Sequence, residues 1–372
     1  MTSKKKLIVI KIGTSSLTTE NGNIAPDKIA SLVDQVCALK ELGHSVILVS
    51  SGAIAAGFTC LGYKTRPRTV PGKQAAAAVG QGLLMEEYTK CLLKHNYIGA
   101  QILLTRGDFT DQRRYKNAFN ALEVLLQRNA IPIINENDTI AIEELKLGDN
   151  DTLAAQVAAM VHSDLLIFMT DIDGLYTANP HTNKQAQHIP VVNEITDEIE
   201  KLAGDTDNNN ATGGMITKIY GAKLATAAGV PVFICRSADE NVLVNAVNGQ
   251  ARGTLFTAKD SALKTRLQWM ALYAESKGNI YIDAGAAKAV EEMGKSLLPS
   301  GIVAIEGDFL KGDVVSVYSQ GDHRYIGKGI VNYNKKDVYA LMGKHSSDLA
   351  FGNKKKPEII HHDNWISEKH FR

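Results

Sequence analysis

Two lysines stand where they could handle a negatively charged ligand. Lys11 interrupts the apolar run "LIVIKIG", and Lys218 closes the Gly-rich segment "NNNATGGMITK" at 208–218. A lysine is costly to bury unless it is paired or bound to an anion, so anion binding by Lys11 competes with an edge position from which its ammonium reaches solvent. Glycines, a helix start and a lysine suit a polyphosphate, although a plain helix-entry loop has the same composition.

Acidic and amide side chains gather at a few points between apolar runs. They are Asp138 in "NEND", the group Asp149, Asn150 and Asp151 in "LKLGDNDTLAA", and Asp171 with Asp173 in "MTDIDGLYT". One such residue at a helix start is most often a cap that accepts backbone N–H bonds, but three in succession exceed what one cap needs. Because we find no Ser–His or Cys–His nucleophile set, the lysines and carboxylates favour phosphoryl transfer, in which cations offset developing charge.

Small residues also follow two apolar runs, in "KIGTSS" (11–16) and "SSGA" (50–53), where backbone N–H groups could approach an anion. Each turn alone is weak evidence. The nearest imitation of a Walker A motif, "MGKS" at 293–296, has Ala289 where that motif requires its first glycine, and we discard it. We find no protein-kinase H-R-D or D-F-G arrangement either.

The elements that must position these residues alternate along the first 250 or so positions. We expect strands at 7–13, 45–50, 99–105, 130–138, 164–176 and 230–235, and helices at 27–42, 72–95, 113–128, 152–161 and 214–228. Near-continuous apolar strands separated by helices predict a largely parallel sheet covered on both faces. Ligands of such sheets bind at the carboxyl ends of the strands, which is where the polar residues lie.

After Phe256 the pattern changes. Residues 257–278 are polar and helical, like a linker, and short strands with tight Gly turns follow at 279–285, 301–309, 312–318, 327–333 and 337–343. We therefore predict a small β-rich domain at the carboxyl end.

Composition limits the function classes. The 372 residues carry 41 Lys and Arg against 40 Asp and Glu, so a net charge of +1 offers no global attraction for nucleic acid or an anionic membrane. The basic start is followed by an apolar run of only 7–10, too short for a secretory signal, and no run is long enough for a membrane helix. The 4 cysteines show no metal-binding spacing, which suits reduced thiols in a cytoplasmic protein.

The chain resembles the amino acid kinase family, and within it the kinases that act on glutamate. The motifs that carry the resemblance, in family order, are "IVIKIGTSSLT", "VILVSSGAIAAG", "QAAAAVGQGLLM", "IPIINENDTIA", "LGDNDTLAAQVA", "MTDIDGLYTANP" and "TGGMITK". The stretch from "KGNIYIDAG" to "KGDVV" is similar to the PUA domain that many of these kinases carry. "PEIIHHDNW" at 357–365 is similar to the family's tail, which disfavours a metal site at His361 and His362.

The resemblance implies a three-layer α/β fold with a mainly parallel central sheet, followed by a β-rich PUA domain. It implies the boundaries 1–257 for the catalytic domain, 258–275 for a linker, 276–353 for the PUA domain and 354–372 for a tail.

The resemblance also implies an activity: ATP-dependent phosphorylation of the γ-carboxylate of L-glutamate, the first step of proline biosynthesis, with Mg2+ accompanying ATP. Proline is the implied feedback inhibitor, and we would look for altered sensitivity in the loop 141–148, at Glu143 and Glu144. Further expectations are a homo-oligomer (dimer or tetramer), hand-over of the product to a glutamyl phosphate reductase, and a cytoplasmic location without membrane or nucleic-acid binding.

Residue roles follow from the same motifs. The implied catalytic residues are Lys11, Asp151 and Lys218, with Asp151 holding the lysines in place; the implied glutamate-binding residues are Ser51, Asp138 and Asn150. The implied ATP site comprises Lys11, Thr170, Asp171, Thr212, Gly213, Gly214, Met215, Ile216, Thr217 and Lys218. No protein ligand for Mg2+ is implied. Ala211 departs from the glycine usual in the family but leaves the assignment standing.

Three alternatives compete with this interpretation. Other kinases of the family act on N-acetylglutamate, aspartate, carbamate or UMP. A PUA domain is usually associated with RNA, but residues 276–352 contain nine Lys or Arg and nine Asp or Glu, a poor basis for binding phosphates. A catalytically silent regulatory subunit is disfavoured because both lysines and Asp151 are present.

Overall fold

The computed structural model describes residues 4–19, 23–140, 150–180, 182–204, 214–258, 267, 269–270, 273–344 and 358–368. The chain forms two compact units: the first spans 1–108 with 113–262, and the second spans 109–112 with 263–372.

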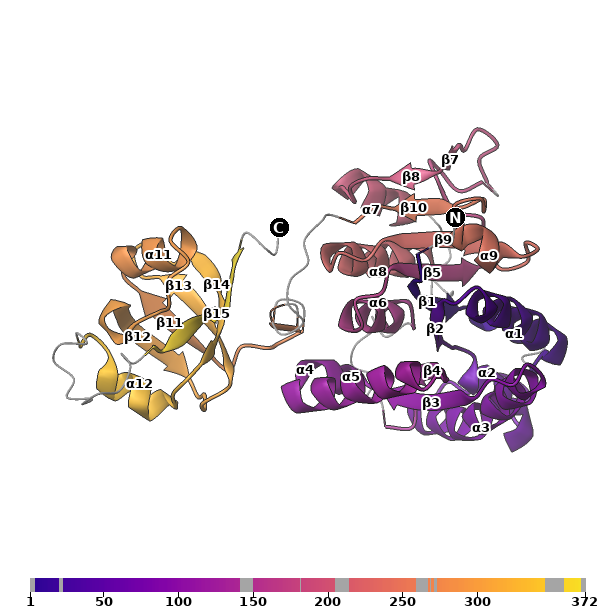
Figure 1. Cartoon of the computed structure of the whole chain (residues 1–372), viewed down its shortest axis with the longest axis horizontal. Coiled ribbons are helices and arrows are strands. Elements are labelled where there is room, and N and C mark those ends of the chain that lie inside the picture. Colours follow the sequence, from indigo (N-terminus) through magenta and orange to yellow (C-terminus); the bar gives the residue numbers. More distant parts are fainter. Residues whose placement is uncertain are drawn as a thin grey trace. The chain divides into compact units, whose positions relative to one another are not determined.

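The first unit is built on an eight-stranded sheet in the order β3-β4-β2-β1-β5-β9-β10-β8 (Figure 1). Its strands are β1 (Leu7–Ile12), β2 (Ser45–Val49), β3 (Gly99–Leu104), β4 (Ile131–Glu136), β5 (Leu165–Thr170), β8 (Val191–Val192), β9 (Val232–Arg236) and β10 (Thr254–Phe256). Neighbouring strands run parallel except for β9 and β10, and β6 (Leu175–Tyr176) pairs with β7 (His188–Ile189) outside this sheet. The expected mainly parallel sheet is confirmed.

The helices of the first unit are α1 (Pro26–Glu41), α2 (Ala53–Phe58), α3 (Val70–Lys94), α4 (Arg106–Thr110), α5 (Gln112–Gln127), α6 (Asn150–Met160), α7 (Asp197–Gly204), α8 (Met215–Ala227) and α9 (Val242–Val247). Two short 3-10 turns, η1 (Thr14–Ser16) and η2 (Thr59–Leu61), connect strands to helices.

Alternation along β1 places its side chains on two faces. Ile8, Ile10 and Ile12 are fully buried in the core that also contains residues of α1, α3 and α9. Successive side chains of a strand point to opposite faces, so Lys11 points to the other face, where α6 packs against β1 and β5. The sheet is therefore sandwiched between helices, and Lys11 lies on the face of α6.

The strand order creates a natural ligand site. β1 pairs with β2 on one side and with β5 on the other, both parallel to it, although β3 and β4 intervene between β2 and β5 in the sequence. The chain thus changes direction across the sheet at β1. Crevices outside the carboxyl ends of strands at such a point are where open α/β sheets bind their ligands.

Glycines let α2 and α3 pack backbone to backbone. A Cβ at Gly80 would lie 1.8 Å from the carbonyl oxygen of Ala53, and one at Gly57 would lie 2.0 Å from that of Ala76. Real Cβ atoms do not approach so closely, so only glycine permits this crossing. The packing matters for the site because α2 begins two residues after Ser51.

We expect Gly80→Ala to destabilise the protein by about 3 kcal/mol, since the added methyl overpacks a contact between two backbones. Thermal unfolding followed by circular dichroism should show a fall of about 5–10 °C in Tm. Gly82→Ala is the matched control: a Cβ there meets nothing within 4 Å, and we expect a gain of about 0.5–1 kcal/mol from helix propensity. Equal melting temperatures for the two variants would contradict a close backbone contact between α2 and α3.

The second unit contains a five-stranded sheet in the order β12-β11-β13-β14-β15. Its elements are β11 (Gly278–Ile282), α11 (Ala284–Glu291), η3 (Pro299–Gly301), β12 (Ile302–Gly307), β13 (Val314–Ser319), β14 (Tyr325–Val331), α12 (Lys335–Leu341) and β15 (Ile360–Ser367). β15 comes from residues expected to form a tail, and it pairs antiparallel with β14. The expected β-rich domain is confirmed, with two helices added.

One predicted strand is wrong. Residues 337–343 were expected to form a strand, but α12 occupies most of them. Val338 is fully buried, Tyr339 is largely exposed, and Leu341 and Met342 pack against the core at the spacing of one helix face. A short, mainly apolar run after a turn was misread because the helical spacing spans only one turn.

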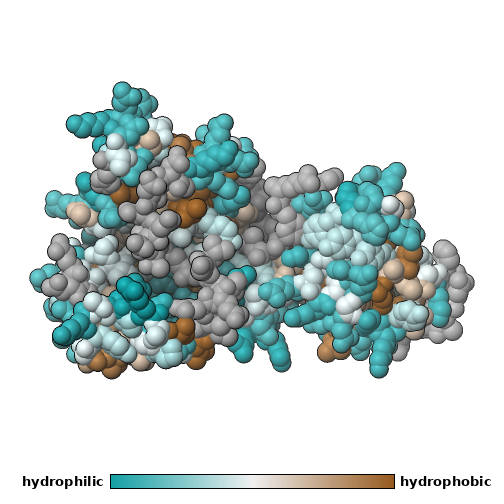
Figure 2. Space-filling model, turned by 180° about the vertical axis from the view of Figure 1, so that it is seen from behind, coloured by the Kyte–Doolittle hydropathy of each residue, from teal (hydrophilic) through white to brown (hydrophobic). Residues whose placement is uncertain are grey.

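No helix among the described residues is long and apolar enough to cross a membrane. Among the described residues on the face shown in Figure 2, hydrophilic and weakly polar side chains predominate over hydrophobic ones.

Candidate functional site

A buried group of three charges lies at the carboxyl end of β1. The ammonium nitrogen of Lys11 is 2.7 Å from Oδ1 of Asp151, and that of Lys218 is 3.2 Å from Oδ2 of the same carboxylate. Thr217 Oγ1 donates a 2.8 Å hydrogen bond to Oδ2. All three charged residues are at most 5% exposed. The predicted catalytic set is thus brought together from one strand and two helices.

The local sequence explains why these three residues meet. Lys11 is the last but one residue of β1, Asp151 lies in the first turn of α6, and Lys218 lies in the first turn of α8. The two helices come close at Gly221, where an added Cβ would lie 3.1 Å from the carbonyl oxygen of Asp151. A side chain at Gly221 would push α8 away from α6 and separate Lys218 from its carboxylate.

The electrostatics keep Asp151 ionised. Burial raises the pKa of this carboxyl, but Lys11 and Lys218 lower it by more, so its pKa lies below the ordinary value. The carboxylate is therefore charged at neutral pH and forms an ion pair with each of the two lysines. Two ammonium groups share one carboxylate, and an arriving anion meets cations that are already oriented.

Next to these charges lies a group of amide and hydroxyl side chains. Asn150 Nδ2 is 2.7 Å from the carbonyl oxygen of Ser50, 3.1 Å from Ser51 Oγ and 2.9 Å from Asn135 Oδ1. Asn135 in turn donates to Gln81 Oε1 at 2.8 Å. Within the described part of the chain, Asn150 Oδ1 is buried and has no hydrogen-bond partner. A buried acceptor without a donor is costly, so this atom is suited to receive a donor from a ligand.

Asn135 and Gln81 were missed by the sequence analysis. Asn135 is 1% exposed inside the apolar strand β4, and a polar residue in such a run is the same signal that drew attention to Lys11. Gln81 gave no comparable signal because it lies on the helix α3, where polar side chains occur at intervals without special meaning. Asn135 accepts a hydrogen bond from the Asn150 amide and is itself held by Gln81, so the two side chains together orient Asn150.

Asp138 lies in the turn after β4 and is half-buried. Burial raises the pKa of its carboxyl, and the nearby Arg66 guanidinium lowers it in part. A partly buried carboxylate at the mouth of the site is suited to pair with a cation, since such charge-assisted contacts are stronger than neutral hydrogen bonds.

The expected nucleotide-binding segments lie on the other side of β1. Thr170 ends β5, is 6% exposed, and donates a 2.9 Å hydrogen bond to Asp171 Oδ1. Thr217 Oγ1 also lies 2.8 Å from the carbonyl oxygen of Gly214, the residue that precedes α8, so its one proton is shared between this oxygen and Asp151. The first turn of α8 runs from a buried Met215 through an exposed Ile216 to Lys218. Its backbone N–H groups lie beside the buried charges, and helix starts of this kind are suited to bind anions.

Several predicted residues lie outside the described part of the chain: Asp149, Thr212 and Gly213, and the loop 141–148 with Glu143 and Glu144. The predictions for them stay predictions. His361, His362 and Asp363 form a group of potential metal ligands among the described residues, exposed on β15 of the second unit. His361 Nδ1 there accepts a hydrogen bond from the backbone N–H of Asp363, and we assign the group no role.

Comparisons with known proteins give this site a context. The model of the amino acid kinase family matches residues 6–236, and that of the PUA domain matches residues 278–352. The chain belongs to the amino acid kinase family. The glutamate 5-kinase of Streptococcus sanguinis is 54% identical over 364 residues, which cover 98% of this chain and 96% of the relative. The glutamate 5-kinase of Neisseria meningitidis is 52% identical over 365 residues, again with 98% and 96% coverage.

A solved structure supports the fold of this family member. Carbamate kinase from Giardia lamblia bound to AMP-PNP has a TM-score of 0.50 with 16% identity, covering 70% of this chain and 100% of that one. The likeness confirms the three-layer amino acid kinase fold of the first unit. Kinases of this family use ATP together with a divalent metal ion.

Proposed function

We propose that this chain transfers the γ-phosphoryl group of ATP to the γ-carboxylate of L-glutamate, giving L-glutamyl 5-phosphate and ADP. The observation that carries the proposal is the buried contact of Lys11 and Lys218 with Asp151 beside the amide group of Asn150. Identity above 50% to glutamate 5-kinases over nearly the whole chain supports the choice of substrate.

The chemistry requires charge compensation more than proton transfer. A glutamate side chain has a pKa of about 4.3, so its carboxylate is already a nucleophile at neutral pH and needs no general base. The difficulty is the repulsion between this carboxylate and the phosphates. Lys11 and Lys218 offset that repulsion when they contact the transferring phosphoryl group, and Asp151 keeps both ammonium groups in place.

Substrate roles follow from the position of each group. Ser51 and Asn150, joined by a hydrogen bond, bind glutamate, and the unpartnered Asn150 Oδ1 accepts a hydrogen bond from its ammonium group. Asp138 pairs with the same ammonium group. Thr170, Asp171 and the segment from Thr212 to Lys218 contact ATP.

Mg2+ is the divalent ion we propose. It prefers oxygen ligands and keeps several waters, so it binds mainly through the ATP phosphates and neutralises part of their charge. Asp151 is not a suitable metal ligand, because its two oxygens already contact Lys11, Lys218 and Thr217. We therefore assign no protein ligand to the ion.

A substrate panel tests the proposal. Pure protein with Mg-ATP should release ADP in the presence of L-glutamate, and much less with N-acetylglutamate, aspartate, carbamate or UMP. Preference for one of the other acceptors would overturn the assignment of substrate, and release of ADP with none of them would revive the silent-subunit alternative.

Asn150→Ala should mainly raise the KM for glutamate, by about 10–100-fold, because it removes both a ligand acceptor and the group that holds Ser51. The kcat and the KM for ATP should change little. Steady-state kinetics with each substrate varied in turn checks this split. Asn245→Ala, on the distant helix α9, is the control and should leave both constants unchanged. A loss confined to kcat would place Asn150 in the phosphoryl-transfer step and contradict its role in binding glutamate.

Regulation and assembly are further parts of the proposal. Proline, which has a cyclised glutamate skeleton, would compete for the region of Asp138 and Asn150. We also propose a homo-oligomer in the cytoplasm that passes its labile acyl phosphate to a glutamyl phosphate reductase. Replacing Glu143 and Glu144 by alanine should alter the concentration of proline that halves the rate.

A further inference from the structure

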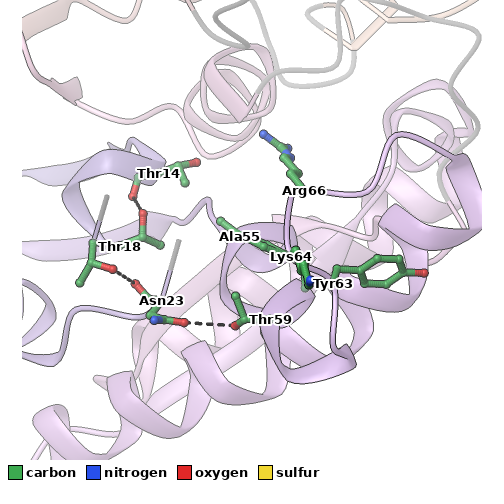
Figure 3. A pocket seen from close by; sticks show the side chains of 10 residues that line it. Thr14, Thr18, Asn23, Ala55, Thr59, Tyr63, Lys64 and Arg66 are labelled. Carbon is green, nitrogen blue, oxygen red and sulfur yellow. Dashed lines mark hydrogen bonds between the residues drawn. The ribbon is translucent and has the colours of Figure 1, made fainter. Parts of the chain in front are cut away.

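A pocket of about 690 Å3 opens in the first unit between η1 and the loop that follows η2. Its lining combines hydroxyl groups, an amide, two cations and apolar side chains, among them Thr14, Thr18, Asn23, Tyr63, Lys64 and Arg66. Figure 3 shows Thr14, Thr18 and Asn23 on one side of the pocket and the loop with Tyr63, Lys64 and Arg66 on the other. Thr59 Oγ1 donates to Asn23 Oδ1 at 3.1 Å and ties the two sides together (Figure 3).

The pocket adjoins the substrate site at Gly52. This glycine follows Ser51 and has a φ of +88°, and a Cβ on it would lie 3.5 Å from Thr14 Cγ2 and 3.6 Å from Thr18 Cγ2. Thr14 and Thr18, which both line the pocket, therefore pack against the residue next to Ser51. Ser51 itself contacts Asn150, so the pocket begins where the proposed glutamate site ends.

The wall formed by the loop is positively charged. Lys64 and Arg66 are exposed, and within the described part of the chain neither forms an ion pair. Arg66 extends away from Tyr63 in Figure 3, and its charge acts on Asp138 from this position. The Asp138 carboxyl thus lies within the electrostatic reach of the Arg66 guanidinium, and no ion pair joins the two among the described residues.

A carboxylate and a guanidinium in one region of a site are complementary to the ammonium group and the α-carboxylate of an α-amino acid. If glutamate presents its γ-carboxylate to Lys11 and its ammonium group to Asp138, its α-carboxylate still requires a cation. Lys11 and Lys218 are held at Asp151 and serve the reacting end. Arg66 lines the pocket next to this site, its charge acts on Asp138, and a guanidinium can bind a carboxylate through two parallel hydrogen bonds.

We propose that Arg66 binds the α-carboxylate of the amino acid substrate and selects substrates that carry it, with Lys64 adding positive charge to the same wall. The inference rests on the proposed function, because it assigns a further specificity residue to the same site. It implies a preference for L-glutamate over 4-aminobutyrate, which keeps the reacting carboxylate and the amine but lacks the α-carboxylate.

The test is Arg66→Gln, with Arg68→Gln as the matched control from the same loop, outside the pocket lining. We expect Arg66→Gln to raise the KM for glutamate by about 10–100-fold with kcat within about threefold of the wild type, and Arg66→Lys to recover part of the loss. Arg68→Gln should change neither constant. Inhibition by 4-aminobutyrate should be equally strong in the wild type and Arg66→Gln, since this ligand has nothing for Arg66 to bind.

An indirect effect of Arg66, exerted only through the pKa of Asp138, can be distinguished from direct binding of the substrate by Arg66. Loss of Arg66 would raise the pKa of Asp138, so an indirect effect on KM would shrink as the pH is raised from neutral to 8.5. A direct contact predicts that the effect persists at that pH. An unchanged KM in Arg66→Gln, or equal effects at Arg66 and Arg68, overturns the inference while leaving the kinase activity established. A wild type that does not phosphorylate glutamate overturns the proposed function, and the inference falls with it.

Discussion

Asp151→Asn should lower kcat by about 10³-fold or more while changing the KM for glutamate by much less. The substitution keeps the shape of the side chain but removes the charge that orients Lys11 and Lys218. Misplaced transition-state cations cost a large part of the rate enhancement in phosphoryl transfer. Steady-state kinetics by ADP release, with each substrate varied, measures the effect.

The same substitution should destabilise the folded protein by about 3–5 kcal/mol, because it leaves two buried ammonium groups without their carboxylate. The kinetics must therefore be measured well below the melting temperature of the variant. Asp34→Asn is the control: Asp34 is largely exposed and pairs with His95 on the surface, so its loss should change neither kcat nor Tm appreciably. If Asp151→Asn lost stability but kept kcat, Asp151 would be a structural helix residue and no more.

Lys11→Met should lower kcat by about 10³–10⁵-fold, the range over which removal of a transition-state cation acts in related chemistry. Methionine fills most of the space of the lysine stem, and Asp151 retains Lys218 and Thr217, so the stability loss should be smaller than for Asp151→Asn. The readout is single-turnover phosphoryl transfer with excess protein over labelled ATP, since it reports the chemical step apart from product release.

Lys40→Met is a matched control for Lys11→Met. Lys40 is also a buried lysine, 7% exposed on α1, and burial lowers its pKa, but it lies over the ring of Tyr97 rather than at the site. We expect its replacement to leave the single-turnover rate unchanged. The double variant Lys11→Met with Asp151→Asn should be little slower than the slower single variant, because the two residues act as one unit. Additive losses would argue for separate roles.

The sequence predicted the main strands of the first unit's sheet well, for a physical reason. Strands buried on both faces need continuous β-branched runs, and that requirement located β1, β2, β4, β5 and β9. The same requirement made Lys11 conspicuous, since a lysine in such a run must have a partner. The structure supplies that partner as Asp151.

Other features depend on contacts between distant parts of the chain. Asn135 and Gln81 lie 54 positions apart, and nothing local indicates that they support Asn150 together. The loop with Arg66 carries no motif, and its relation to Asp138 emerges only when α2 is packed against α3. The helix α12 was misread because one turn of apolar spacing resembles a short strand, and β15 was missed because its alternation is interrupted by His361, His362 and Asp363.

The most direct test of the central claim is to trap the acyl phosphate. Protein, L-glutamate, Mg-ATP and hydroxylamine should give γ-glutamyl hydroxamate in amounts equal to the ADP formed, and Asp151→Asn should abolish both. Hydroxylamine attacks only an activated carboxyl group, so the product reports the substrate, the bond formed and the position of the phosphate together. ADP release without hydroxamate, or hydroxamate from N-acetylglutamate in preference to glutamate, would contradict phosphorylation of the γ-carboxylate of glutamate at this site.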